Sequence, residues 1–393
     1  MLVGLFFARP LYRKKFLTIG DFYHEKYGRS VEILVTLCII VYFFGWVAAQ
    51  ILALGLVFNV VSEGFISKNA GMLIGSGSVL IYTIFGGMWA VAITDFLQMI
   101  IIVIGMLFIG HELSGMTGGV MVVAQHASNA GLFNFWPDLN FASIAGFIAA
   151  LFTMMLGSIP QQDVFQRVTS SKNETIAVRG AILGGVLYFG FAFVPMFLAY
   201  SATLIDPKLV SEHLNSDPQM ILPSMIMQHT PLFAQIMFFG ALLSAIKSCA
   251  SATLLAPSVS FSENIIKGFF KHLSQKQLLI VMRCTVIGFT GLVTLFALNS
   301  HLSIFKMVEN AYKITLVSAF IPLVFGIYWS KAKPMGGLLS IVLGLSVWII
   351  SELVAADAVI APQLSGLIAS LLGMLIGSLL IPQEMLKTAR QLD

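Results

Sequence analysis

The stretch ILVTLCIIVYFFGWVAAQILALGLVF, residues 33–58, contains no Asp, Glu, Lys or Arg. An α-helix rises about 1.5 Å per residue, so roughly 20 apolar residues cross the ~30 Å hydrocarbon core of a bilayer. The stretch is longer than that, and the charged segment 9–29 lies just before it. It therefore predicts a membrane-spanning helix.

Similar apolar runs recur along the whole chain. Hydrophobic residues make up 58% of the 393 residues and charged residues only 10%, whereas soluble domains carry about 25% charged residues. So few charges cannot cover a water-soluble surface of this size. We predict an all-α membrane protein with a single transmembrane domain over 1–393 and ten spans near 30–61, 70–88, 92–112, 141–160, 177–204, 232–258, 277–298, 303–329, 335–353 and 360–381.

The distribution of basic residues predicts the orientation of these spans. Of the 22 Lys and Arg residues, 17 fall in alternate connecting segments, whereas the opposite loops hold Lys68 and Lys208. Cytoplasmic loops are the ones enriched in Lys and Arg. We therefore expect a multi-pass protein of the cell inner membrane, with its C-terminus cytoplasmic and with these basic segments inside: 9–29, 162–179, 259–283, 330–334 and 383–393.

Two segments outside the spans carry further expectations. MLVGLFF, residues 1–7, is followed at once by Arg9; it is too short to cross a bilayer and lacks the features of a signal peptide. It predicts the last turns of a helix that begins upstream, in a chain truncated at its N-terminus. The segment 205–231, which includes Pro207, Pro218 and Pro223, predicts either a folded outer lid or a plain linker.

No motif in the sequence indicates enzyme chemistry. Cys38, Cys249 and Cys284 each lie inside an apolar run without metal-ligand spacing, which predicts free buried thiols. Phosphate-binding loops and the GxSxG and HExxH motifs do not occur in the sequence. We expect no enzyme, no organic cofactor, no nucleic-acid partner, and a monomer.

Three groups of residues carry a family pattern: LTIGDFYHEKYG (17–28) with IFGGMWAVAITDFLQ (84–98), GSIPQQDVFQRVTSSKN (157–173), and GALLSAIKSCASATLLAPSVSFSENI (240–265). Together they resemble the sodium:solute symporter family, in a bacterial form nearest to its high-affinity choline transporters. The resemblance implies a five-plus-five inverted-repeat (LeuT-like) core in which the first helix of each repeat is broken. In this chain the core would lack its first helix and most of its second, and two further helices would follow it.

A candidate ion site lies on the run 232–258. Ala245, Ser248 and Cys249 are spaced i, i+3, i+4 and so share one helical face. In the family, the resemblance implies, these positions give a carbonyl and two hydroxyls to Na⁺. Here a thiol, which is a soft ligand, replaces the second hydroxyl. Close helix packing through small residues is the alternative for this face.

Two ionisable residues lie inside apolar runs. Asp95 follows Thr94 near the cytoplasmic start of a span; the resemblance places it on the inner sodium pathway, and a helix N-terminal charge is the alternative. Lys247 lies near mid-span, where a charge costs about 2.5–3.5 kcal/mol. It is a candidate coupling residue that substitutes for the cation or titrates, with Asp95 as its natural partner. Snorkelling to the cytoplasm is the alternative.

The candidate solute site joins one span to a helix break. Trp46, with Tyr42 one turn earlier, aligns with a tryptophan of the choline cage, where cation–π contact binds quaternary ammonium; core packing is the alternative. Pro160 interrupts a helix, and such breaks expose polar groups at the membrane midplane. Gln161 and Gln162 are the candidate contacts there, although Gln161 replaces a second cage tryptophan. Asp163 and Arg167, one turn apart, predict a structural ion pair.

These observations predict a secondary active transporter. It would import a small organic solute by alternating access, coupled to Na⁺ or H⁺, within the lipid bilayer. Two alternatives stay open: a membrane sensor or regulator that keeps the fold without transport, and an inactive truncated product. Quaternary ammonium compounds, amino acids such as proline, and monocarboxylates are all open as solutes.

Overall fold

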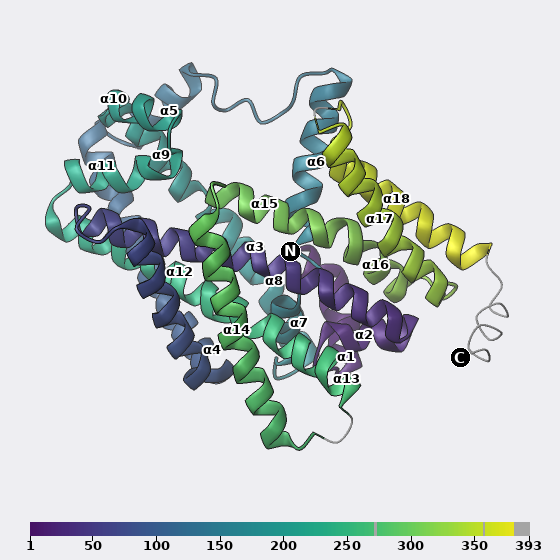
Figure 1. Ribbon diagram of the computed structural model, residues 1–393. Helices are drawn as coiled ribbons and strands as arrows, with labels where there is room; N and C mark the ends of the chain where they lie inside the picture. Colours follow the sequence, from purple (N-terminus) through teal and green to yellow (C-terminus); the bar gives the residue numbers. More distant parts are fainter. Residues whose placement is uncertain (271–272, 357, 381–393) are drawn as a thin grey trace.

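The computed structural model describes residues 1–270, 273–356 and 358–380, apart from the side chains of 86–90. Within these ranges the chain forms helices and no strands (Figure 1). The helices, with π- and 3₁₀-helical segments labelled η, are η1 (Val3–Phe7), α1 (Ala8–Lys14), α2 (Ile19–Tyr27), α3 (Arg29–Val61), α4 (Lys68–Thr117), α5 (Val120–Asn129), α6 (Phe141–Gly157), α7 (Gln162–Thr169), α8 (Glu174–Phe191), α9 (Phe193–Ile205), α10 (Pro207–Leu214), η2 (Pro218–Met220), α11 (Ile221–His229), α12 (Leu232–Ser260), η3 (Phe261–Ile266), α13 (Lys267–Phe269), α14 (Gln275–Asn299), α15 (Ile304–Thr315), η4 (Leu316–Phe320), α16 (Ile321–Tyr328), α17 (Pro334–Val354) and α18 (Pro362–Leu379).

Most of the predicted spans are present as long apolar helices. In the described part of the chain, eight are long and apolar enough to cross a bilayer, and the bent pair α6–α7 adds a ninth. The remaining predicted span, 70–88, reaches side chains outside that part and stays a prediction. Tyr82 and Thr94 nevertheless hydrogen-bond, although 12 residues of straight helix would separate them by about 18 Å. The segments 68–85 and 91–117 therefore lie side by side.

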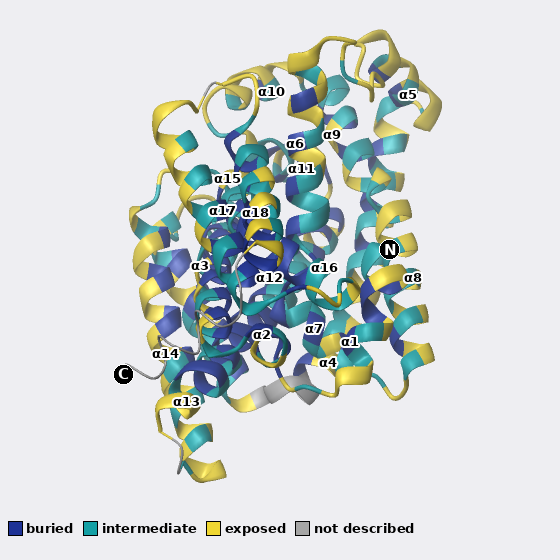
Figure 2. Cartoon of the chain, turned by 90° about the vertical axis from the view of Figure 1, so that its right-hand side faces the viewer, coloured by how far each residue is buried: buried dark blue, intermediate teal, exposed yellow. Residues whose placement is uncertain are grey.

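Helix α3, which contains the stretch 33–58, runs through the middle of the molecule. It packs against α4, α12, α14 and α15, and many of its residues are buried. Buried residues gather around α3, α12 and α7, whereas exposed ones cover the outer helices such as α8 (Figure 2). Exposed apolar side chains such as Leu187 and Phe189 on α8 suit contact with lipid, which needs no polar surface.

The predicted break at Pro160 is present. Helix α6 ends at Gly157 and α7 begins at Gln162, with a bend of 45° between them. Gly157 is required there, because an added Cβ would lie 2.5 Å from the Tyr312 carbonyl oxygen of α15. The Gly157 carbonyl, freed from helical bonding by the break, accepts a hydrogen bond from Thr315 Oγ1 at 2.7 Å. The break is therefore fixed against α15.

The connecting segments are more ordered than a linker requires. Between α9 and α12 the chain folds into α10, η2 and α11 (Figure 1), so 205–231 is a folded segment rather than a plain linker, and its role as an outer lid stays a prediction. Asp206 caps α10 by accepting from Leu209 N at 3.0 Å. At the N-terminus, helical structure runs to Lys14, and Arg9 and Arg13 both contact Glu174 on α8, at 2.8 and 2.9 Å. The predicted cytoplasmic tail, 383–393, lies outside the described residues.

Candidate functional site

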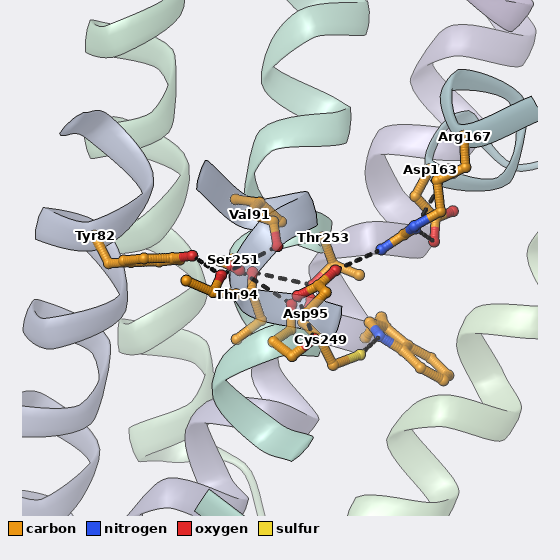
Figure 3. Close-up of polar contacts among 12 residues, drawn as sticks. Tyr82, Val91, Thr94, Asp95, Asp163, Arg167, Cys249, Ser251 and Thr253 are labelled. Carbon is orange, nitrogen blue, oxygen red and sulfur yellow. Dashed lines mark hydrogen bonds and ion pairs between the residues drawn. The ribbon is translucent and has the colours of Figure 1, made fainter. Parts of the chain in front are cut away.

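Helix α12 holds three of the ion candidates, and two adjacent residues on it contact the fourth ion candidate, Asp95, and one solute candidate, Trp46. Ser248 Oγ donates a hydrogen bond to Asp95 Oδ1 on α4 at 2.5 Å. Cys249 Sγ accepts one from Trp46 Nε1 on α3 at 3.1 Å (Figure 3). Ala245, one turn earlier on the same helix, is half-buried. Residues predicted separately, from three distant stretches of sequence, thus meet around one helix.

The partner of Asp95 is Arg167, and not Lys247 as the sequence suggested. Arg167 Nη2 lies 3.5 Å from Asp95 Oδ2, and Nη1 lies 3.2 Å from Asp163 Oδ2. The guanidinium group lies between the two carboxylates (Figure 3). The predicted pairing of Asp163 with Arg167 is confirmed. Its extension to Asp95 was missed, because helical spacing reveals pairs within one helix and Asp95 belongs to another.

Lys247 points elsewhere. Its Nζ lies 5.0 Å from the centre of the Tyr82 ring, within the range of a cation–π contact. The sequence places Lys247 one residue before Ser248, about 100° away around the helix. The ammonium group therefore contacts the first half of α4 rather than the Asp95 carboxylate in the second half.

A cavity leads away from Asp95. It has a volume of about 50 Å³ and is lined by Asp95, Arg167, Gln166 and Leu255, among others. Gln166 and Leu255 also line a cavity of about 620 Å³ that includes Lys15. The positive-inside rule assigns the segments 9–29 and 162–179 to the cytoplasm. The Asp95 side chain thus lines a small cavity that shares Gln166 and Leu255 with a larger one, which lies at segments predicted to be cytoplasmic.

Three aromatic rings lie together where the sequence predicts the solute site. The Tyr42 and Trp46 rings are stacked with their centres 6.2 Å apart, and Tyr312 on α15 lies 5.6 Å from Tyr42 and 5.2 Å from Trp46. We call Tyr42, Trp46 and Tyr312 the aromatic trio. Tyr312 was not predicted, since no motif marks it and its neighbours lie far away in sequence.

The two glutamines at the break have different surroundings. Gln161 donates from Nε2 to the Gly157 carbonyl at 3.1 Å, and its side chain also interacts with the Tyr42 hydroxyl. Gln162 is fully buried: its Oε1 accepts from Ile19 N at 2.8 Å, and its Nε2 donates to Leu17 O at 3.4 Å. Gln161 therefore borders the trio, whereas Gln162 ties α7 to the segment before α2.

The fold and the site together define a polytopic α-helical membrane protein with a broken core helix beside a partly buried polar cluster. The sequence model of the sodium:solute symporter family matches residues 1–344. The chain belongs to that family. The relatives to which it is similar are transporters and not enzymes.

Individual relatives agree with this assignment. The human "High affinity choline transporter 1" is 30% identical over 76% of this chain and 52% of its own length. The osmoregulated proline transporter OpuE of Bacillus subtilis is 25% identical over 91% of this chain and 74% of its own. The Staphylococcus aureus sodium/proline symporter is 28% identical, over 85% and 66% respectively. This chain therefore spans about half the length of the human choline transporter that it matches.

The fold has a solved counterpart. A Na⁺-coupled sialic acid symporter in a substrate-bound outward-open state superposes with a TM-score of 0.78 at 19% identity, covering 97% of this chain and 81% of the other. At this identity the likeness shows the fold alone. It confirms the predicted LeuT-like class of all-α membrane protein.

Proposed function

We propose that this chain is the core of a secondary active transporter that couples Na⁺ entry to import of a small organic solute. The observation that carries the proposal is the adjacency of Ser248 and Cys249, which joins the Asp95 cluster to Trp46 across one turn of α12. A cation bound on one side of α12 would then change the affinity for the solute on the other side. Family membership supports the coupling to Na⁺.

The ion would bind at Asp95 and Ser248, with the Ala245 carbonyl nearby. Na⁺ prefers hard oxygen ligands, and the Asp95 carboxylate and Ser248 hydroxyl already lie in contact. Cys249 would serve as a hydrogen-bond acceptor for Trp46 rather than as an ion ligand, because a thiol is soft. A proton on Asp95 is the rival coupling species, and Lys247 would tune the local potential from its place over Tyr82.

The solute would bind against the aromatic trio, with Gln161 as its polar contact. Broken helices in transporters of this kind present free backbone groups at the membrane midplane, and the α6–α7 break lies beside both Gln161 and Tyr312. Gln162 would position α7 through the backbone of 17–19. Alternating access would then expose the site first to one side of the bilayer and then to the other. The protein would do this as a monomer.

Uptake into proteoliposomes tests this proposal. The complete protein is reconstituted and supplied with radiolabelled choline, proline and acetate, under an inward Na⁺ gradient or an equal K⁺ gradient. We expect accumulation of at least one solute with Na⁺ and none above the protein-free background with K⁺. Binding of a solute without accumulation would support the sensor alternative. Accumulation driven equally by K⁺ would contradict Na⁺ coupling.

A further inference from the structure

Helix α2 connects the two helices that carry most of the candidate site, α7 and α12. At the start of α2, Ile19 N donates a hydrogen bond to Oε1 of Gln162, the first residue of α7, at 2.8 Å. Two residues further on, Asp21 Oδ1 accepts one at 3.0 Å from Nδ2 of Asn264, which lies in η3, the continuation of α12. The positive-inside rule places Asp21 and Asn264 on the cytoplasmic side. A short, largely buried helix thus bridges α7 and α12 on that side.

The Asn264 amide is the centre of this bridge. Its Nδ2 donates to Asp21 Oδ1 and to Glu32 Oε1, each at 3.0 Å. Asn264 is 1% exposed and Glu32 is 3% exposed, and hydrogen bonds to charged groups away from water are the stronger ones. Asp21 Oδ2 accepts from Thr18 N at 2.9 Å in the capping box of α2, which fixes the carboxylate. One amide group therefore holds α2 and α3 against the end of α12.

The backbone of α2 also fits closely against this amide. A Cβ added at Gly20 would lie 2.6 Å from Asn264 Cγ, closer than a real Cβ atom approaches its neighbours. Further along the same end of α12, Arg29 Nη2 donates to Ile265 O at 3.5 Å, and a Cβ added at Gly268 would lie 1.8 Å from this nitrogen. The two segments are therefore in direct contact, without room for a further side chain.

A cavity lies next to this contact. It has a volume of about 620 Å³ and is lined by Leu17, just before α2, and by Leu255 and Val259 on α12, among others. Asp21 lies four residues after Leu17, and Asn264 lies five residues after Val259. Leu255 also lines the small cavity at the ion candidates. Separation of Asp21 from Asn264 would therefore widen the space that leads to those candidates.

The closed contact leaves three polar atoms without partners. Asn264 Oδ1, Ser262 Oγ and Ser260 Oγ are shielded from solvent and have no hydrogen-bond partner among the described residues. Each such atom opposes burial, because it gives up its hydrogen bonds to water. The two bonds from Asn264 Nδ2 stabilise the closed contact, and these three atoms favour its opening. A conformational switch requires two arrangements whose free energies differ by only a few kcal/mol.

We propose that Asn264 is a cytoplasmic latch: its bonds to Asp21 and Glu32 hold the inner side of the candidate site closed, and they break when α7 and α12 move apart to open that side. This inference rests on the proposed function, because inward opening is one step of alternating access. The opening itself can be measured without transport, so the two proposals are tested separately.

The reactivity of Cys249 from the cytoplasmic side tests the latch. Cys249 lies on α12 three residues before Ala252, which lines the small cavity. A membrane-impermeant methanethiosulfonate is added to inside-out vesicles that contain the complete protein, and mass spectrometry of peptides follows the modification of Cys249. We expect Asn264→Ala to raise the rate about tenfold, the equivalent of about 1.4 kcal/mol, because it removes both bonds. Asn299→Ala, at the exposed end of α14, is the control and should not change the rate.

Gly20→Ala tests the same contact from its other side. This variant removes no polar group and suits a helix, but its Cβ displaces the Asn264 amide. We expect it to raise the rate of Cys249 modification about fivefold or more. The matched control is Gly288→Ala, where an added Cβ meets no atom within 4 Å. Because Gly20→Ala keeps every polar group, it decides the question even if Asn264→Ala does not fold.

The side from which Cys249 becomes reactive distinguishes a latch from a general loosening of the fold. In right-side-out vesicles the reagent arrives from the opposite side, and neither Asn264→Ala nor Gly20→Ala should raise the rate there. An equal rise from both sides would mean that Asn264 only stabilises the fold, and unchanged rates in both variants would mean that the contact is no latch; either result overturns the inference. If the variants open inward as expected but the wild type accumulates no solute with Na⁺, the proposed function alone is wrong.

Discussion

Two groups of charged side chains lie in the membrane-spanning part of this molecule, and they differ in their sum. On α15 and α17, Lys306 contacts Glu309 at 2.8 Å, and Lys313 contacts Glu309 at 3.9 Å and Glu352 at 3.6 Å. Two positive and two negative charges cancel. On α4 and α7, Asp95 and Asp163 share Arg167, the one basic side chain within 4.0 Å of either carboxylate among the described residues, which leaves a formal sum of −1.

This difference separates a structural group from a binding group. Charges taken out of water are tolerated when they are paired, and an unpaired one is strongly unfavourable. The α15–α17 group is complete by itself and needs no ligand. In the proposed function, the Asp95–Arg167–Asp163 group would be completed by a cation from outside, as coupled transport of a cation requires. We therefore expect Na⁺ to change the stability of variants in one group and not of variants in the other.

The largest effect is expected for Arg167→Gln. It changes the sum of the group from −1 to −2, so the protein in KCl should lose about 1–3 kcal/mol of stability, less than the ~3–5 of a fully buried pair because Arg167 is half exposed. NaCl should restore more of that loss than it adds to the wild type, since Na⁺ then meets two free carboxylates. Thermal unfolding in detergent at equal ionic strength measures both. If NaCl stabilises the variant and the wild type by equal amounts relative to KCl, the charge count is wrong.

Lys313→Met should produce a smaller loss without any Na⁺ dependence. The Lys313 side chain is buried, but Glu352 is partly exposed and Lys306 still contacts Glu309. We expect a loss of about 1–2 kcal/mol in NaCl and KCl alike. The same unfolding assay serves as the measurement. A Na⁺-dependent loss would mean that this group also binds the ion, and the distinction between the two groups would fail.

Lys247→Met should have the smallest effect. It removes a cation–π contact with Tyr82, worth about 0.5–1 kcal/mol at exposed sites, and leaves the Asp95 cluster intact. The half-saturating Na⁺ concentration for uptake should change by less than about fivefold. If uptake by the variant no longer needs Na⁺, or if its half-saturating Na⁺ concentration changes by much more than fivefold, Lys247 is a coupling residue that replaces the cation.

Most of the spans were predictable from sequence because one physical quantity, the length of an apolar run, decides each of them, whereas the LeuT-like arrangement of the helices was predicted by the family resemblance. The α6–α7 break was predictable from Pro160 for a similar local reason. The contacts of the candidate site were predictable in part: Asp95, Ser248, Cys249 and Trp46 are candidates from the sequence, and they meet along α12. Their binding of ion or solute stays a prediction. Tyr312 was not, because its place in the trio depends on how α15 packs beside α3.

The role of Arg167 shows the same limit. Its i, i+4 spacing from Asp163 reveals one partner, but the contact with Asp95 arises only when α4 and α7 come together. Likewise Lys247 was paired with Asp95 because both are charges in apolar runs. The rotation of α12 directs the lysine to Tyr82 instead. Contacts between helices, and so the sum of charges in a cluster, appear only in three dimensions.

Binding of radioactive sodium to the purified protein tests the central claim most directly. The wild type should bind Na⁺ saturably, and Asp95→Asn should weaken that binding by about 10–100-fold, the equivalent of a charged contact of roughly 1.5–3 kcal/mol. Asp138→Asn should bind like the wild type. If Asp95→Asn saturates at the same Na⁺ concentration as the wild type, the ion does not bind at the Asp95 cluster and this account is wrong.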